Sequence, residues 1–228
     1  PHLHIKAFTA VEIDYLAKIA GLSVSETLLA LREAGLGSLP GGGAEIFNPG
    51  VRNTLCAEKI SGDRWLEVME TAHGIGLKSN ATMLYGHIET VEDRVDHLLR
   101  LRELQDRTGG FQAFIPLSFH AQNTEITKSA YTTGFDDLKT LAISRLMLDN
   151  FDHIKAYWVM LGEKITQVSL SFGVDDIDGT VVEERITKMA GGTTDGSMTR
   201  DDLVDLIKQA GKTPVERDTV YNTVRVWG

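Results

Sequence analysis

Apolar segments that suit strands alternate with amphipathic segments that suit helices along most of this chain. The expected strands are His4–Phe8, Lys78–Tyr85, Phe111–Phe119 and His153–Met160. The expected helices between them cover residues 11–19, 24–31, 61–76, 91–107 and 135–150. A strand and its helices together take roughly 35 to 40 residues, which is typical of parallel β/α architecture. Because the strands are apolar on both faces, we expect a sheet that is covered by helices.

The C-terminal part of the chain has a less regular pattern. Residues 165–170 suit either a strand or a helix, and residues 175–178 suit an acidic loop or a very short strand. A helix is expected from Thr199 to Ala210, because Asp202 follows Thr199 at the spacing of a capping box. The tail, residues 212–228, is expected to be irregular. We predict one domain over residues 1–228, with a C-terminal segment from about residue 190 packed on it.

Composition narrows the possible classes of function. The 228 residues have a formal net charge of -9, which argues against nucleic-acid binding because phosphate recognition needs a basic surface. No apolar run approaches membrane-spanning length, and the opening PHLHIKAFTA has no signal-peptide pattern, so we expect a cytoplasmic protein without a membrane partner. The single cysteine, Cys56, excludes an internal disulfide and a cysteine metal cage within one chain.

The segment SLPGGGAEIF contains three consecutive glycines, and we call its residues 40–47 the glycine loop. Glycine lets a ligand approach the main chain, whose N–H groups can bind anionic or polar atoms. In a parallel β/α barrel the chemistry lies at the carboxyl ends of the strands, where polar residues recur in this chain. These residues are Thr9, Glu12, Glu45, His87, Glu89, Thr90, His120, Gln122, Asn123, Asp175, Asp176, Asp178 and Thr180.

Structural roles are alternatives for several of these polar residues. Glu12, Glu45 and Glu89 could each stabilise the first turn of a helix through its dipole. His87 could be a structural histidine that is held by hydrogen bonds. The aspartates within residues 175–178 could hold a divalent cation or form a solvated acidic turn. These alternatives stay open on the residues alone.

Longer motifs identify a family. ATMLYGHIET, which covers residues 81–90, and the segment VEDRVDHLLRLRELQDRTGGFQAFIPLSFH that follows it resemble radical S-adenosylmethionine (SAM) enzymes of the futalosine route to menaquinone. FTAVEI, LPGGGAEIF, HIKAYWVMLG, DDIDGTVVEE and PVERDTVYN extend the resemblance from about His4 to Asn222. The last two segments favour the aminodeoxyfutalosine synthases. The sister enzymes that cyclise dehypoxanthine futalosine share the GGGAEI and ATM-YG elements.

This resemblance implies a TIM-type β/α barrel and a particular chemistry. SAM would be cleaved reductively at a 4Fe-4S cluster, which needs an external reductant. The 5′-deoxyadenosyl radical would then add to the double bond of 3-[(1-carboxyvinyl)oxy]benzoate, and rearrangement with loss of carbon dioxide would give aminodeoxyfutalosine. The cofactors would perform this chemistry while the protein orients them and excludes water.

The chain departs from the family pattern at the cluster. The family holds its cluster with three cysteines spaced CxxxCxxC after the first barrel strand, and no such motif occurs here. Since iron–sulfur clusters depend on thiolate ligands, we expect this chain to hold no cluster and to be inactive by itself. The expectation is an incomplete barrel, with strands three to eight, and association into oligomers through its exposed edges.

The resemblance also implies roles for individual residues. The SAM-binding candidates are Gly41, Gly42, Gly43, Glu45, Tyr85, His87, Glu89, Pro116 and His120. The substrate-binding candidates are Thr9, Arg52, Asp176, Asp178 and Thr180. Arg52 is included because a guanidinium can bind a substrate carboxylate in a bidentate manner. The alternatives to a synthase are the sister cyclase and a cluster-free barrel that binds a nucleoside without catalysis.

Overall fold

The computed structural model describes residues 3–121, 124, 126, 132–181, 189 and 197–228, so the predicted site residues Gln122 and Asn123 lie outside the described residues. The chain divides into two compact units, which are described separately. Unit 1 comprises residues 1–83, 89–115 and 147–152, and unit 2 comprises residues 84–88, 116–146 and 153–228.

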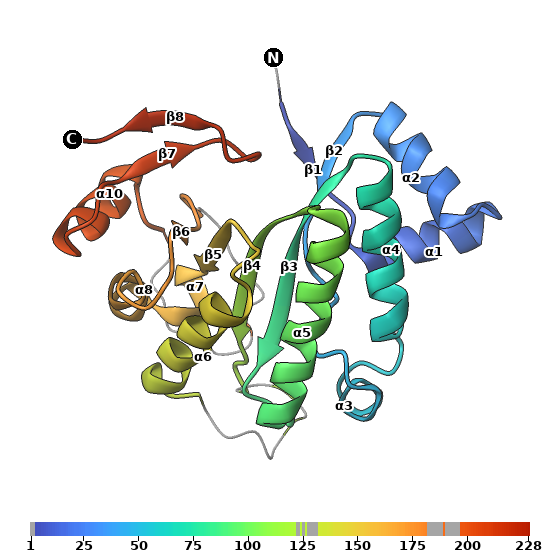
Figure 1. Cartoon of the computed structure of the whole chain (residues 1–228), viewed down its shortest axis with the longest axis horizontal. Helices are drawn as coiled ribbons and strands as arrows, with labels where there is room; N and C mark the ends of the chain where they lie inside the picture. The colour runs from blue at the N-terminus through green and yellow to red at the C-terminus, as the bar shows by residue number, and fades with distance from the viewer. Residues whose placement is uncertain (1–2, 122–123, 125, 127–131, 182–188, 190–196) are drawn as a thin grey trace. The chain divides into compact units, whose positions relative to one another are not determined.

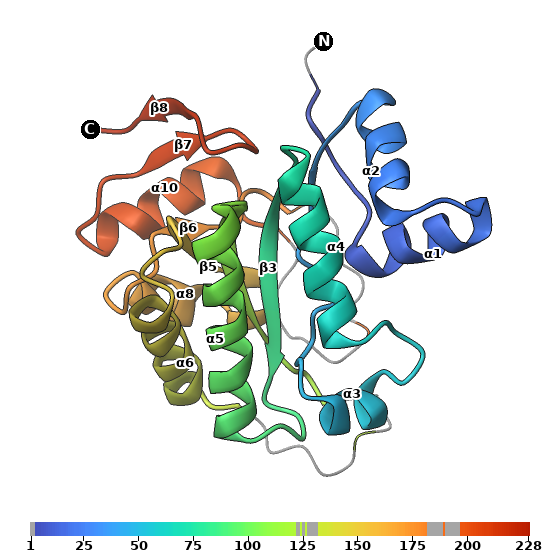
Figure 2. The ribbon, with the colours of Figure 1, turned by 45° about the vertical axis from the view of Figure 1, so that its right-hand side comes forward.

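Unit 1 contains strands in parallel pairing with helices between them. Its elements are β1 (Ile5–Lys6), α1 (Ala10–Ala20), α2 (Val24–Glu33), β2 (Leu36–Leu39), α3 (Pro49–Leu55), α4 (Gly62–Gly74), β3 (Lys78–Tyr85), α5 (Val91–Thr108) and β4 (Phe111–Ser118), with β3 and β4 continuing into unit 2. The pairs β1–β2 and β2–β3 are parallel, and Leu39 lies opposite Ser79. Helices α4 and α5 lie side by side along β3 (Figure 2).

Capping explains where three helices of unit 1 begin. Thr9, Ser23 and Thr90 each accept a hydrogen bond from the third helical residue, whose acidic side chain bonds back to the cap. These are complete capping boxes. The partner of Thr9 is Glu12, so Glu12 has the helix-stabilising role that was one of its two interpretations.

The core of unit 1 lies between the strands and α4 and α5. Trp65 is fully buried, and its ring stacks on Phe111 with the centroids 6.3 Å apart. His97 from α5 is fully buried, stacks on Phe47 and lies 2.9 Å from the carbonyl oxygen of Thr82 through Nε2. Aromatic side chains from α4, α5, β4 and the glycine loop therefore pack together behind β3.

Unit 2 contains α6 (Gly134–Met147, whose last residue belongs to unit 1), β5 (His153–Ala156), α7 (Trp158–Leu161), α8 (Glu163–Ser169), β6 (Asp176–Ile177), α10 (Arg200–Gln209), β7 (Val215–Arg217) and β8 (Thr223–Val226). Strands β5 and β6 are parallel, whereas β7 and β8 form an antiparallel hairpin. Figure 1 shows this hairpin beside α10 at the C-terminal end of the chain.

Three local predictions for unit 2 need correction or are decided by the structure. The strand predicted over His153–Met160 ends at Ala156, and the helical turn α7 follows. The ambiguous residues 165–170 belong mainly to helix α8. The tail is not irregular, because β7 and β8 pair across a turn in which the Asp218 carboxylate accepts hydrogen bonds from the N–H groups of Val220 and Asn222. The predicted helix capped by Thr199 is confirmed as α10.

The strands follow chain order in the sheet, β1-β2-β3-β4-β5-β6. Parallel strands in this order, with helices between them, are the arrangement of six consecutive strands of a β/α barrel, so the predicted fold class is confirmed. The prediction of one domain with a packed C-terminal segment stays a prediction. Within the described residues, no helix is both long enough and apolar enough to cross a bilayer.

Candidate functional site

The glycine loop follows β2 and lies directly against β3. A Cβ atom added to Gly41 would come within 2.8–2.9 Å of the backbone of Asn80 and Ala81, so only glycine fits at this position. Thr82 of β3 fixes the same residue, because its hydroxyl donates a hydrogen bond of 2.7 Å to the Gly41 carbonyl. The loop therefore has a defined position on the neighbouring strand.

Gly42 and Gly43 are held by other elements of unit 1. The indole N–H of Trp65 donates to the Gly42 carbonyl at 3.1 Å. Gly43 has a φ of +82°, and a Cβ there would lie 2.6 Å from a methyl group of Val11. A Cβ on Gly42 would lie 3.1 Å from the Thr9 methyl group. The structure thus brings the predicted site residues Thr9 and Gly42 together at the carboxyl ends of β1 and β2.

Arg52 has a different environment from the one expected of a substrate ligand. It is buried in α3, and its guanidinium makes five hydrogen bonds to the carbonyl oxygens of residues 43, 44, 46 and 60. A guanidinium has five N–H donors in total, so none remains for a substrate carboxylate. This geometry favours a structural role, in which Arg52 holds the glycine loop to α3 and the segment after it, and its predicted contact with the substrate stays a prediction.

Glu45 lies in the glycine loop with a φ of +46°, a conformation that is uncommon for a residue with a side chain. Its carboxylate forms an ion pair of 2.7 Å with Lys59, and 16% of its side chain is exposed. Helix α3 begins only at Pro49 and is capped by Asn48, so Glu45 does not lie in the first turn of a helix. Its predicted contact with SAM stays a prediction.

Tyr85, at the end of β3, faces α6. Its ring is fully buried, and its hydroxyl donates a hydrogen bond of 2.7 Å to Asp137. Burial raises the pKa of Asp137, although hydrogen bonds from Tyr85 and Ser118 act in the opposite direction. Asp137 was not among the residues predicted from the sequence, because an acidic residue in a helix usually lies on its solvated face.

His87 follows Gly86, which has a φ of +89°. The N–H of Ile88 donates to Nδ1 of His87 at 2.7 Å, so Nε2 carries the proton and donates to the Leu84 carbonyl at 2.9 Å. Both ring nitrogens therefore bond to the main chain, which favours the structural interpretation of this histidine. The SAM contact predicted for His87 is not tested by this geometry.

The remaining SAM-binding candidates have internal partners or lie in the sheet. The Glu89 carboxylate is enclosed and forms an ion pair of 2.6 Å with Arg94. His120 lies 3.2 Å from the carbonyl oxygen of Met160 through Nε2, and Pro116 lies within β4. These residues stand at or near strand ends as expected, but their ligand contacts stay predictions.

Asp176 and Asp178 belong to an ionic cluster in unit 2, the Asp176 cluster, which comprises Lys155, Asp176, Asp178, Arg217 and Tyr221. Arg217 binds Asp176 in a bidentate manner at 2.7 and 2.8 Å, and the Tyr221 hydroxyl donates to the same carboxylate at 2.9 Å. The Lys155 ammonium lies 3.0 Å from Asp178 and 3.4 Å from Asp176. Burial alone would raise the pKa of Asp176, but the hydrogen bonds and charges of Arg217 and Lys155 outweigh burial and lower it.

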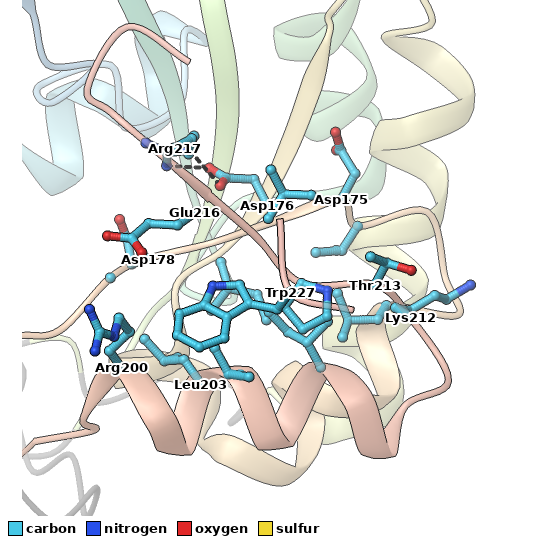
Figure 3. Close-up of a pocket in the computed structure, with 18 of the residues that line it drawn as sticks. Asp175, Asp176, Asp178, Arg200, Leu203, Lys212, Thr213, Glu216, Arg217 and Trp227 are labelled. Carbon is cyan, nitrogen blue, oxygen red and sulfur yellow. Dashed lines mark hydrogen bonds and ion pairs between the residues drawn. The ribbon is translucent and has the colours of Figure 1, made fainter. Parts of the chain in front are cut away.

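A pocket of about 630 Å³ extends along β6, α10 and the hairpin of unit 2 (Figure 3). Asp176, Asp178 and Thr180 line it, together with apolar side chains such as Leu203 and Trp227. The hairpin packs against the first residues of β5 and β6. Arg217 and Tyr221 bind Asp176 of β6, and the Tyr221 ring stacks on His153 of β5. The hairpin thus contacts the amino-terminal ends of β5 and β6, whereas Asp178 and Thr180 follow β6 and also line the pocket. The predicted substrate contacts of Asp176, Asp178 and Thr180 stay predictions.

The residues of this chain do not fit an iron–sulfur cluster. Cys56 is the only cysteine, and burial raises the pKa of its thiol. Within the described ranges, no group of three or more histidine, cysteine or acidic side chains could hold a metal ion. We therefore derive no chemical step through a cluster.

Comparison with protein families decides the membership of the chain. Residues 108–227, more than half of the chain, match the family model described as the CofH/MqnC C-terminal region. The chain belongs to this family. The resemblance predicted from the motifs is therefore confirmed at the family level.

Relatives of this CofH/MqnC chain include two proteins named aminodeoxyfutalosine synthase. The protein from Thermus thermophilus is 53% identical over 100% of the chain, and the one from Streptomyces coelicolor is 47% identical over 99%. A 5-amino-6-(D-ribitylamino)uracil–L-tyrosine 4-hydroxyphenyl transferase from Methanococcoides burtonii is 40% identical over 99%. The chain spans 62%, 61% and 65% of these three relatives, respectively.

A solved structure supports the fold of this CofH/MqnC chain. Methylornithine synthase is 18% identical and superimposes with a TM-score of 0.61, covering 91% of the chain and 63% of the methylornithine synthase chain. At this level of identity the similarity concerns the fold alone.

Proposed function

We propose that this chain is part of an aminodeoxyfutalosine synthase. The observation that supports the proposal best is the 53% identity to the Thermus thermophilus protein of that name over the whole chain. The complete enzyme would join the 5′-deoxyadenosyl group of SAM to 3-[(1-carboxyvinyl)oxy]benzoate, with a 4Fe-4S cluster and an external reductant. We place it in the cytoplasm.

In this proposal the chain binds and orients small molecules. The glycine loop presents its backbone beside SAM, and its position on β3 is fixed by Thr82 and by the close approach of Gly41. Arg52 stabilises the loop conformation by donating hydrogen bonds to three of its carbonyl oxygens. Glu45 contributes a carboxylate that can accept hydrogen bonds from a ribose hydroxyl or from the ammonium group of SAM.

A second candidate function is 4-hydroxyphenyl transfer from tyrosine to 5-amino-6-(D-ribitylamino)uracil. The identity of 40% to a protein of that name over 99% of the chain supports it, but this identity is lower than that to the synthases. The two functions differ in their substrates, so one assay with both substrate sets distinguishes them.

The test begins with the gene. We expect the codons upstream of Pro1 to encode a CxxxCxxC motif. The full gene product, reconstituted anaerobically with iron and sulfide, is then incubated with SAM, a reductant and either substrate set, and the products are identified by mass spectrometry. Aminodeoxyfutalosine is the expected product. The hydroxyphenyl transfer product would favour the second candidate, and neither product would refute both.

A further inference from the structure

Two buried or half-buried carboxamide side chains in the described part of unit 1 have no hydrogen bond. The side-chain oxygens of Asn80 in β3 and Gln112 in β4 are enclosed without any hydrogen bond, and only 5% of Asn80 is exposed. An enclosed polar atom without a partner is destabilising, and native proteins keep few of them. Since no described residue binds either carboxamide, two such side chains that lie together are available to a ligand.

Strand pairing places these two carboxamides side by side. The N–H of Ser79 donates to the Gly110 carbonyl at 3.1 Å, which in a parallel pair sets Ser79 beside Phe111 and Asn80 beside Gln112. Ser79 and Phe111 both face α4, since His73 bonds to the Ser79 hydroxyl and lies edge-on to the Phe111 ring. Successive residues of a strand point to opposite faces, so Asn80 and Gln112 share the face that is turned away from α4.

The carboxamide pair is next to the glycine loop. Thr82, two residues beyond Asn80 on the same face of β3, donates its hydroxyl hydrogen to the Gly41 carbonyl. Gly41 itself lies against the backbone of Asn80 and Ala81. In the proposed function SAM lies at the glycine loop, and the substrate must lie next to SAM for the deoxyadenosyl group to be transferred, so the substrate would be within reach of the pair.

The groups that the pair can offer to a ligand are hydrogen-bond donors. The oxygens are the enclosed atoms in both residues, which leaves the NH₂ groups to meet a ligand. Neighbouring strands are about 4.8 Å apart, a spacing that one carboxylate can bridge by accepting from both NH₂ groups. Neutral donors can bind the anion without adding a second buried charge.

We infer that Asn80 and Gln112 bind a carboxylate of the substrate. The inference rests on the proposed function, in which the substrate 3-[(1-carboxyvinyl)oxy]benzoate carries two carboxylates. The pair takes the carboxylate-binding role that was predicted for Arg52, because all five donors of Arg52 are bound to backbone carbonyls. The carboxamide pair thus determines specificity for an acidic substrate.

The test measures binding to the full gene product by isothermal titration calorimetry. Asn80→Asp and Gln112→Glu keep the shape of each side chain but replace the NH₂ donor with a charged acceptor. We expect the affinity for 3-[(1-carboxyvinyl)oxy]benzoate to fall about tenfold or more in each variant, because like charges now meet. The affinity for SAM, titrated separately, should change less than about threefold.

Gln105→Glu is the matched control. Gln105 is also a buried carboxamide, but it bonds to both the N–H and the carbonyl of Phe111, so its substitution should lower stability without changing substrate affinity. Thermal melts check that each variant folds. If an acid variant does not fold, Asn80→Ala and Gln112→Ala remove the carboxamide without adding charge, and substrate affinity should still fall about threefold or more.

The outcomes separate this inference from the proposed function. Unchanged substrate affinity in folded Asn80 and Gln112 variants would overturn the inference alone, as would an equal loss of affinity for SAM. A wild-type protein that binds neither 3-[(1-carboxyvinyl)oxy]benzoate nor SAM would overturn the proposed function, and the ligand named here with it.

Discussion

At the scale of single residues, two buried histidines make the stability of unit 1 dependent on pH. Burial lowers the pKa of His97 to about 3. Burial, together with the nearby charge of Lys78, lowers the pKa of His73 to about 4. Both values lie below the ordinary value of about 6.5, so the unfolded chain binds these protons more readily than the folded chain.

The free energy of unfolding should therefore fall as the pH falls. The stabilisation is fully present above about pH 6.5 and is lost as the pH decreases toward 4 for His73 and 3 for His97. When the pH falls from 6.5 to 5, each histidine should lower the free energy of unfolding by about 2 kcal/mol. Urea unfolding at both pH values measures the loss, and His97→Gln, which removes one titrating group, should show a smaller one. An identical loss in this variant would contradict the prediction.

Arg52 should be a structural residue whose replacement by lysine is costly. A lysine ammonium has three donors on one atom and cannot reach all four carbonyl oxygens that Arg52 binds. With at least one carbonyl left unpaired in the interior, Arg52→Lys should lower the free energy of unfolding by about 3 kcal/mol. Arg32→Lys is the control, because Arg32 makes one exposed bond to a carbonyl and its replacement should change little. Equal melting temperatures for the two variants would refute this role.

Glu45→Gln tests the loop carboxylate in the full gene product. If Glu45 accepts hydrogen bonds from SAM, removal of its charge should weaken SAM binding about tenfold or more. The ion pair with Lys59 is partly exposed, so stability should change by about 1 kcal/mol or less. Calorimetric titration with SAM beside a thermal melt separates the two roles. Lys59→Met is the control, since it breaks the same ion pair but keeps the carboxylate. If Glu45→Gln binds SAM as tightly as the wild type, the role of Glu45 is limited to its ion pair with Lys59.

At the scale of secondary structure, periodicity predicted the long elements and failed on the short ones. Strand β3 was predicted with its observed bounds, because glycines at positions 76 and 86 flank the segment and its second half is apolar. The segment after His153 reads as one strand in the sequence, yet it turns into α7 at Trp158, whose indole N–H donates to the Gly179 carbonyl. That contact spans 21 residues and has no signature in the local pattern.

The hairpin β7–β8 was missed for a similar reason. Its strands are short, and the side chains of β8 are exposed, so they lack the apolar alternation that predicts a half-buried strand. Its position depends on Arg217 and Tyr221, which bind an aspartate 41 and 45 residues away. The site candidates predicted from the sequence were taken mainly from strand ends, and they did not include Asn80 or Gln112 on the strand faces. The alternation of β3 could have indicated Asn80, but only the Ser79–Gly110 bond reveals its neighbour Gln112.

The Asp176 cluster should control the stability of the hairpin. Arg217→Met removes a bidentate partner of a buried carboxylate, which should lower the free energy of unfolding of unit 2 by about 3 kcal/mol. Hydrogen exchange of the amides in β7 and β8 should accelerate accordingly. Arg107→Met is the control, since its ion pair with Glu70 is exposed and adds little. Equal exchange rates in Arg217→Met and the wild type would show that other contacts hold the hairpin.

At the scale of the whole molecule, the 228-residue chain should associate in solution. The sheet order ends at β1 and β6, and edge strands readily pair with other chains. Large apolar side chains are exposed beside β1, with Leu3 at 84% and Ile5 at 43%. We expect light scattering to give a mass above that of the monomer and rising with concentration. Leu3→Lys combined with Ile5→Lys should lower it, and a monomeric wild-type chain at high concentration would contradict the prediction.

The distance along the chain between Asp176 and its partners matters during synthesis on the ribosome. The carboxylate of Asp176 is made 41 residues before Arg217 and 45 residues before Tyr221. Until those residues leave the exit tunnel, Lys155 is the one cation left among the described ion-pair partners of Asp176, and β6 lacks the contacts that the hairpin provides later. Domains fold as they emerge, from the N-terminal side onward. Unit 2 should therefore be the last part of this chain to become resistant to proteases, and a stalled nascent chain that ends before Arg217 should be cut there first.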